Sequence, residues 1–134
     1  MNSCGGFGKS GNRVTACVDS DVLIDYFDGI PAAAEELSRY GGLVISRISW
    51  MEVLAGAPSE DLRLMREDFL RQFSIVELDE RVARDAIGLR QKRRLKLHDA
   101  IGWASARLNE ALLVTHDTRD FPAHESGVRI PCQV

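Results

Sequence analysis

The sequence of 134 residues lacks several features that would place it in particular classes of protein. It has no uninterrupted apolar stretch near the roughly 20 residues that a membrane-spanning helix needs. Its N-terminus lacks the apolar core of a secretory signal. The three cysteines, Cys4, Cys17 and Cys132, are odd in number, far apart and without zinc-site spacing, which argues against a disulfide framework. These absences predict a cytoplasmic protein with no membrane segment and with reduced thiols.

The composition predicts one globular domain. Hydrophobic residues make up 45% of the chain and charged residues 28%, a balance that can support a single core at this length. The formal net charge of -3 does not by itself favour nucleic-acid binding, because what matters is where the basic residues lie. Residues 1–13 are rich in Gly, Ser and Asn, so we expect a flexible N-terminal leader before a folded domain at residues 14–134.

Short β-rich runs alternate with longer helical patterns along the folded domain. Strands are predicted at residues 14–18, 43–46, 74–78, 111–115 and 128–131. Helices are predicted near residues 21–28, 31–40, 48–56, 59–72, 80–94 and 98–110. Because strands separated by helices need crossover connections, this order predicts a three-layer α/β/α sandwich around a five-stranded, mainly parallel sheet.

Four acids from distant segments are predicted to meet at one edge of this sheet. In a parallel sheet, the carboxyl ends of the strands and the starts of the following helices share an edge, where ligand sites gather. Carboxylates brought together raise one another's pKa values unless a cation intervenes. Hard oxygen donors without His or Cys suit Mg²⁺ or Mn²⁺. The four acids are Asp19, Glu52, Asp99 and Asp117.

Each acid, taken singly, also has a purely structural interpretation. Asp19 or Ser20 could cap the following helix. The segment from Ser49 to Glu52 fits a Ser-x-x-Glu capping box. Asp99 in a first helical turn would interact well with the helix dipole. Since capping needs only one acid per helix, however, it does not explain why all of the acids fall at the same edge.

Helical periodicity gives two further expectations about these acids. Glu52 falls beside Met51 and Ala55 on a stripe that we expect to face inward. Asp99 falls away from the apolar stripe that begins at Leu97, so periodicity does not support its burial.

Four motifs, in this order, resemble those of the PIN domain, and particularly those of the VapC toxins of bacterial and archaeal toxin-antitoxin pairs. The motifs are VDSDVLID, SRISWMEVLAG, KLHDAIGWASA and LVTHDTRDF, and the likeness runs from about Val14 to Val134. The resemblance implies that Asp19, Glu52, Asp99 and Asp117 surround one or two Mg²⁺ or Mn²⁺ ions.

The implied activity is hydrolysis of RNA phosphodiester bonds by a metal-dependent endoribonuclease. We expect Asp19 and Asp99 to be the central ligands and Glu52 a ligand or the acceptor of the water's proton. Ser20 and Thr115 could add hydrogen bonds to metal-bound water or phosphate, and Asp120 could support Asp117 or share its role. The resemblance also implies a homodimer and neutralisation by a cognate antitoxin of the VapB kind.

A basic segment directly precedes Asp99. Its five cations could draw the RNA backbone toward the acids, with a contribution that weakens as salt rises. A solvated helix end with cations that favour the dipole explains the same pattern. These cations are Arg90, Lys92, Arg93, Arg94 and Lys96. His98 is expected to be an ordinary first-turn residue, although it could shuttle a proton, and no role is assigned to His116.

Three other functions remain in competition. VDSDV also fits the opening motif of haloacid-dehalogenase-like Mg²⁺-dependent phosphatases, although such a protein leaves Glu52 and Asp99 unexplained. A phospho-accepting receiver domain would want a Lys after its last strand, and VRIPCQV offers none. A non-catalytic PIN scaffold used only for binding would usually have lost one of the four acids, and all four are present here.

Overall fold

The computed structural model describes residues 14–116 and 127–129, and within them it contains one parallel sheet of five strands. The strand order is β3-β2-β1-β4-β5, and every neighbouring pair is parallel. β1 therefore lies at the centre of the sheet, with β2 and β3 on one side and β4 and β5 on the other. The strands are β1 (Thr15–Val18), β2 (Gly42–Ser46), β3 (Ser74–Val76), β4 (Leu112–Val114) and β5 (Val128–Arg129).

Helices connect the strands, and several start at side-chain caps that the sequence supplies. Ser46, Ser59 and Asp79 each accept a hydrogen bond from a backbone N–H in the first turn of the helix that follows. Pro31 opens another helix at a position where its missing N–H costs nothing. The helices are α1 (Ser20–Phe27), α2 (Pro31–Leu37), α3 (Arg47–Ala55), α4 (Glu60–Leu70), α5 (Glu80–Arg93) and α6 (Leu97–Leu108).

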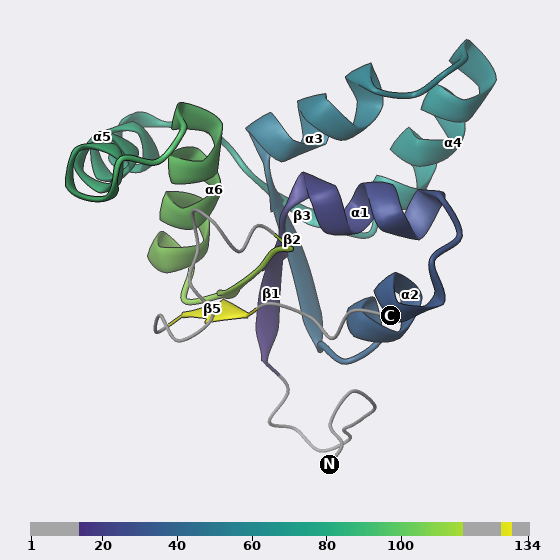
Figure 1. The fold of residues 1–134 in the computed structure, drawn as a ribbon, viewed down its shortest axis with the longest axis horizontal. Coiled ribbons are helices and arrows are strands. Elements are labelled where there is room, and N and C mark those ends of the chain that lie inside the picture. The colour runs from purple at the N-terminus through teal and green to yellow at the C-terminus, as the bar shows by residue number, and fades with distance from the viewer. Residues whose placement is uncertain (1–13, 117–126, 130–134) are drawn as a thin grey trace.

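The two faces of the sheet carry separate hydrophobic clusters. Cys17 and Leu113 face α5 and α6 and pack with residues such as Trp103. Ala16 and Val18, which alternate with Cys17 along β1, belong to the cluster formed with α1, α3 and α4. Figure 1 shows α5 and α6 on one side of the sheet and α1 to α4 on the other. The three-layer α/β/α class predicted from the sequence is therefore confirmed.

One expectation about a helix face is wrong, and Asp99 is buried although helical periodicity gave no support for its burial. Met51 is 51% exposed and Ala55 is also exposed, because α3 buries Ser49, Val53 and Leu54 instead. Asp99 is only 6% exposed, because α6 lies between the sheet and α5 and is buried on nearly all sides from Asp99 onward. A helical wheel presumes one buried face, and α6 does not have only one.

The capping box proposed for Glu52 is also absent. Ser46 is the N-cap of α3, and its hydroxyl accepts the N–H of Ser49 at 3.1 Å. Glu52 therefore lies a turn beyond the capping position, and its carboxylate is available for contacts with other elements.

Among the residues described, no helix has the length and apolar character needed to cross a membrane. Residues 1–13 lie outside those described, so the division into a leader and a domain stays a prediction.

Candidate active site

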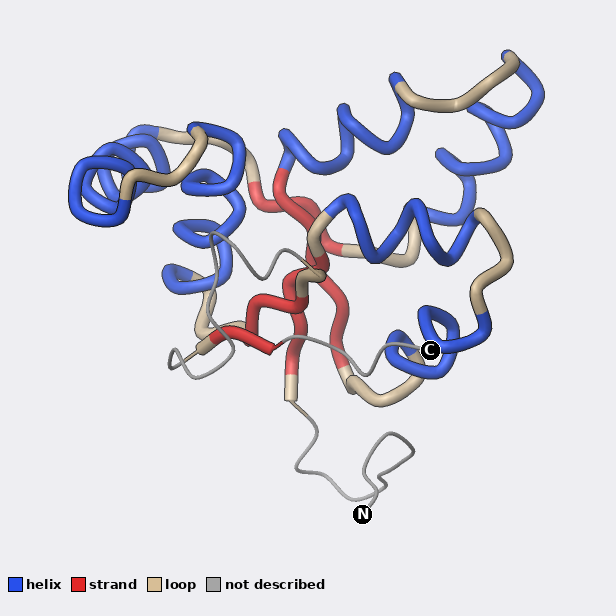
Figure 2. The backbone as a smooth tube through the Cα atoms, in the orientation of Figure 1, coloured by secondary structure: helices blue, strands red, loops and turns tan. Residues whose placement is uncertain are grey.

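The site begins where β1 and β2 end. Both strands lead directly into helices, α1 and α3, which leave the sheet on the same side (Figure 2). Asp19 is the single residue between β1 and α1, and its backbone N–H donates to the carbonyl of Val114 in β4 at 2.9 Å. The carboxyl end of the central strand is thus tied to that of its neighbour, which places Asp19 at the middle of this edge.

The Asp19 carboxylate is held at both of its oxygens. The hydroxyl of Thr115, 96 residues away in sequence, donates to Oδ2 at 2.8 Å. The N–H of Ser20 donates to Oδ1 at 2.9 Å. Burial raises the pKa of the Asp19 carboxyl, these two hydrogen bonds counteract part of the rise, and the negative charge of Glu52 adds to it.

Glu52 and Asp99 reach the same edge from α3 and α6. The hydroxyl of Ser20 donates to Glu52 Oε1 at 2.9 Å, so α1 fixes the acid of α3. His98 lies between the two acids, with Nδ1 3.6 Å from Glu52 Oε2 and Nε2 3.3 Å from Asp99 Oδ1. His98 thus contacts two of the predicted ligands, a role that its sequence position did not reveal.

Asp21 is a further member of the site that the sequence analysis missed. Its carboxylate accepts the backbone N–H of His116 at 3.1 Å and lies 3.4 Å from the Thr115 hydroxyl. Burial and, next, the charge of Asp19 raise the pKa of Asp21 to about 7. One turn further along α1, Asp25 Oδ2 lies 2.9 Å from Nδ1 of His116. The spacing of Asp21 and Asp25, four residues apart on one helix face, was the available signal.

The structure brings five of the seven predicted acidic and supporting residues to this edge. They are Asp19, Glu52, Asp99, Ser20 and Thr115. Asp117 and Asp120 lie outside the described residues. Their expected contribution to the site stays a prediction.

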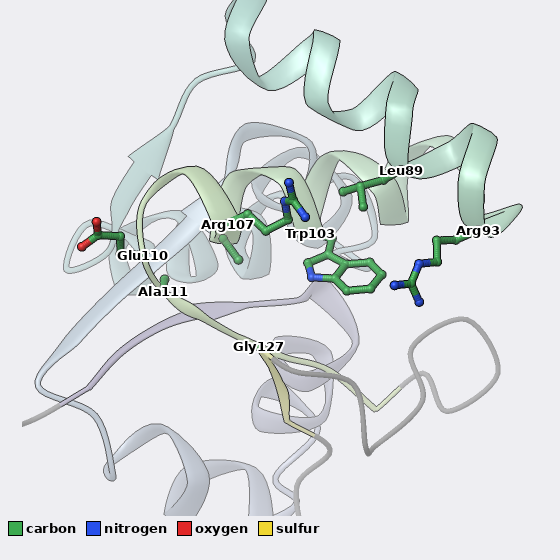
Figure 3. Close-up of a pocket in the computed structure, with 8 residues that line it drawn as sticks. Leu89, Arg93, Trp103, Arg107, Glu110, Ala111 and Gly127 are labelled. Atoms are coloured by element: carbon green, nitrogen blue, oxygen red, sulfur yellow. The ribbon is translucent and has the colours of Figure 1, made fainter.

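The basic segment lies at the end of α5 and in the turn to α6, and all five of its cations are exposed. Arg90 donates to the carbonyl of Leu95 at 2.6 Å, and the Arg93 guanidinium lies 5.2 Å from the centre of the Trp103 ring. Arg93 and Trp103 line a pocket of about 380 Å³, whose other lining residues include Ala111 and Gly127, just before β4 and β5 (Figure 3). That pocket therefore extends toward the amino ends of the strands, away from the acids.

The donor set fits a hard divalent cation in its chemistry. Asp19, Asp21, Glu52 and Asp99 all offer carboxylate oxygens, which Mg²⁺ and Mn²⁺ prefer. Burial is the main cause of the raised pKa values of Asp19 and Asp21, and a neighbouring carboxylate adds to each, a contribution that a cation would offset. Within residues 14–116 and 127–129, no three His, Cys, Asp or Glu side chains form a group that could hold a metal ion. The acids are gathered, therefore, but not arranged as a complete set of ligands.

The family comparison agrees with this geometry. The family model described as PIN domain matches residues 16–125. The chain belongs to the PIN domain family. No curated protein matches this chain significantly.

Solved structures extend the likeness to VapC-type toxins. The toxin-antitoxin complex from Klebsiella pneumoniae contains a chain 36% identical to this PIN domain, with a TM-score of 0.83, covering 89% of this chain and 99% of that chain. FitAcB from Neisseria gonorrhoeae matches at 19% identity and a TM-score of 0.70, covering 86% and 96%. DNA-bound VapBC from Salmonella typhimurium matches at 18% identity and a TM-score of 0.66, covering 87% and 96%. At these two lower identities the likeness establishes the fold.

Proposed function

We propose that this PIN domain is a metal-dependent endoribonuclease toxin of the VapC kind. The observation that carries the proposal is the meeting of Asp19, Glu52 and Asp99, from three distant segments, at the carboxyl edge of the sheet. Capping accounts for acids singly, but it does not account for acids from three distant segments that lie at one partly buried edge. The toxin assignment is supported by the Klebsiella pneumoniae match, whose structure is a toxin-antitoxin complex.

In this proposal Asp19 and Asp99 hold one or two Mg²⁺ or Mn²⁺ ions, and Asp117 completes the set. A bound divalent ion would lower the pKa of a water molecule and stabilise the departing oxygen of the phosphodiester. Glu52 is either a further ligand or the acceptor of the water's proton. Thr115 orients Asp19 and Ser20 orients Glu52 through the hydrogen bonds described above.

The RNA backbone would approach over the end of α5. Lys92, Arg94 and Lys96 are exposed, and their positive charge would attract phosphates toward the acidic edge. Because this attraction is sequence-independent, the choice of RNA must depend on other contacts. Binding should weaken with rising salt.

The antitoxin would cover an apolar groove between α1, α2 and α4. The groove has a volume of about 430 Å³ and is lined by Tyr26, Phe27 and Phe69, with Met65 at 52% exposure on its side. An apolar helix of a VapB-like antitoxin would bury these side chains.

Met65→Glu should weaken binding of the co-expressed antitoxin by about tenfold or more in a titration, because it places a charge on this apolar surface. Unchanged affinity would place the antitoxin elsewhere. A homodimer is a further expectation.

The deciding experiment compares RNA cleavage by the wild-type chain, Asp19→Asn, Asp99→Asn and Asp85→Asn in Mg²⁺ or Mn²⁺. We expect the first two variants to lose more than about 100-fold in rate, because each loses a ligand charge. Asp85, whose carboxylate pairs with Arg107 between α5 and α6, lies outside the site, so Asp85→Asn should cleave normally. The products should carry 5′-phosphate and 3′-hydroxyl ends.

The same preparations separate the competing activities. Release of phosphate from a monoester, with a trapped phospho-aspartate at Asp19, would indicate a phosphatase of the haloacid-dehalogenase kind. Metal binding without any hydrolysis would indicate a binding scaffold. Full RNA cleavage by Asp19→Asn would overturn the site itself.

A further inference from the structure

A buried ion pair outside the acidic edge joins α2 to the last described strand. Glu36 in α2 is only 2% exposed, and both of its carboxylate oxygens accept hydrogen bonds from Arg129 in β5. The distances are 2.6 Å from Nε and 3.0 Å from Nη2, a two-pronged geometry. The hydroxyl of Tyr40 also donates to Glu36. This arrangement is well satisfied and, taken alone, is a structural contact.

The backbone of the same arginine continues toward the acidic edge. The carbonyl of Arg129 accepts the N–H of Thr115 at 3.0 Å. The hydroxyl of Thr115 in turn donates to Asp19 Oδ2 at 2.8 Å. Three successive contacts therefore run from Glu36 through Arg129 and Thr115 to the central acid of the site.

The strand at the middle of this series lies at an edge of the described sheet. The described residues of β5 are Val128, which packs in the core cluster with Trp103, and Arg129, and β4 is the partner strand. Its pairing with β4 sets Leu113 opposite Val128 and Val114 opposite Arg129, and the N–H groups of Leu113 and Thr115 donate to the carbonyls of Gly127 and Arg129. A strand at the edge of a sheet, paired on one side, opens more readily than a central strand unless side chains anchor it. The Glu36–Arg129 pair is such an anchor, and it ties β5 to a helix residue 93 positions earlier in the chain.

We propose that Glu36 and Arg129 are positioning residues, which keep β5 in register with β4 so that Thr115 holds Asp19 in the orientation that the site needs. This inference rests on the proposed function for the use of Asp19. It assigns to Glu36, which touches none of the acids of the site, control over the geometry of the metal-binding edge. Thr115 is one contact removed from Asp19, and loss of a partner in such a position changes metal affinity by about 10- to 100-fold.

The test combines hydrogen exchange with Mn²⁺ titration in Glu36→Gln and Arg129→Lys. In Glu36→Gln we expect faster exchange of the Leu113 and Thr115 amides and Mn²⁺ binding weakened by about tenfold. Arg129→Lys keeps the charge but loses the two-pronged geometry, so its exchange rates and Mn²⁺ affinity should lie between those of Glu36→Gln and wild type. The amides of β2, such as Val44, should exchange as in wild type in both variants.

Arg107→Met is the matched control. It removes another two-pronged pair, with Asp85, which joins α5 to α6 and involves no residue of the series from Glu36 to Asp19. It should change neither the exchange of Thr115 nor Mn²⁺ affinity. If Glu36→Gln left both quantities unchanged, or if Arg107→Met altered them equally, the positioning role would be overturned.

Hydrogen exchange needs neither RNA nor metal, so this result is independent of the nuclease proposal. If Asp19→Asn cleaved RNA normally, the function would fail even though the exchange at Thr115 had changed. If Glu36→Gln folded too poorly to measure, Arg129→Lys alone would decide, because wild-type exchange at Thr115 in that variant would contradict the proposal.

Discussion

Asp19 and Glu36 are both withdrawn from water, but their surroundings act on them in opposite directions. Burial, with a further contribution from Glu52, raises the pKa of Asp19. Burial also raises the pKa of Glu36, but hydrogen bonds from Arg129 and Tyr40 and the charge of Arg129 outweigh it and bring the pKa below 4.5. The comparison separates a carboxyl whose surroundings disfavour its negative charge from a carboxyl whose partners stabilise its negative charge. At neutral pH the charge of Asp19 therefore opposes folding, whereas the charge of Glu36 stabilises the folded protein.

The largest effect should come from adding the divalent cation proposed to bind at Asp19. At a Mg²⁺ or Mn²⁺ concentration of 100 times the dissociation constant, the free energy of unfolding should rise by about 2.7 kcal/mol. Denaturant unfolding with and without the ion measures this. Asp19→Asn should lose most of the gain, and Asp85→Asn should keep it. An equal gain in wild type and Asp19→Asn would mean that the ion binds elsewhere.

The next effect concerns the paired acid. Glu36→Gln should lower the free energy of unfolding by about 1–3 kcal/mol, because it leaves the Arg129 guanidinium, 26% exposed, without its carboxylate. Urea unfolding at neutral pH gives the value. Glu60→Gln is a useful reference, because Glu60 pairs with Arg63 on the exposed surface of α4 and should matter far less. Equal losses of unfolding free energy in Glu36→Gln and Glu60→Gln would mean that the buried pair stabilises the protein no more than the exposed pair.

Lowering the pH should remove the difference in unfolding free energy between wild type and Glu36→Gln. Because the pKa of Glu36 is lower in the folded chain than its ordinary value of 4.5, its stabilising contribution is complete above that pH. The contribution is lost as the pH falls through the folded value. The charged and titratable groups that contact Glu36 are Arg39, Tyr40 and Arg129. The difference in unfolding free energy between wild type and Glu36→Gln, measured from pH 7 to pH 3, should be flat above about 4.5 and shrink below it.

The smallest effect should be a gain in the free energy of unfolding when Asp19 is replaced by Asn. Since the pKa of Asp19 is raised by folding, its charge opposes folding at neutral pH. Asp19→Asn removes that charge, so in the absence of divalent ions we expect the free energy of unfolding to rise by about 1 kcal/mol. Thermal unfolding in chelator is the measurement. A clear loss of stability would show that the hydrogen bonds to Asp19 outweigh its charge.

Sequence alone predicted the elements of the fold well, because their signals are local. The apolar runs before Asp19 and Ser46 became β1 and β2 within a residue or so, and Ser59 and Asp79 capped helices close to the expected starts. The convergence of the acids was predictable because strand order and helix starts fix which ends share an edge. The burial of Asp99 was not, since it depends on how α6 is enclosed by its neighbours.

Contacts between distant side chains were the other part that could not be predicted. His98 and His116 have ordinary sequence contexts, and only the folded arrangement places them against Asp99 and Asp25. The pairing of Glu36 with Arg129 spans 93 residues and has no local signature. Asp21 could have been included, because its position two residues after Asp19 was visible.

The central place of β1 has a consequence for synthesis of the protein on the ribosome. A nascent chain that has emerged only as far as α5 already contains Asp19 and Glu52, but neither Asp99 nor the threonine that orients Asp19. Its β1 would have β2 and β3 on one side and an unpaired edge on the other, because β4 follows α5 and α6 in the chain. If the chain is a ribonuclease, an unfinished copy still bound to the translation machinery would lack the means to cut the RNA around it.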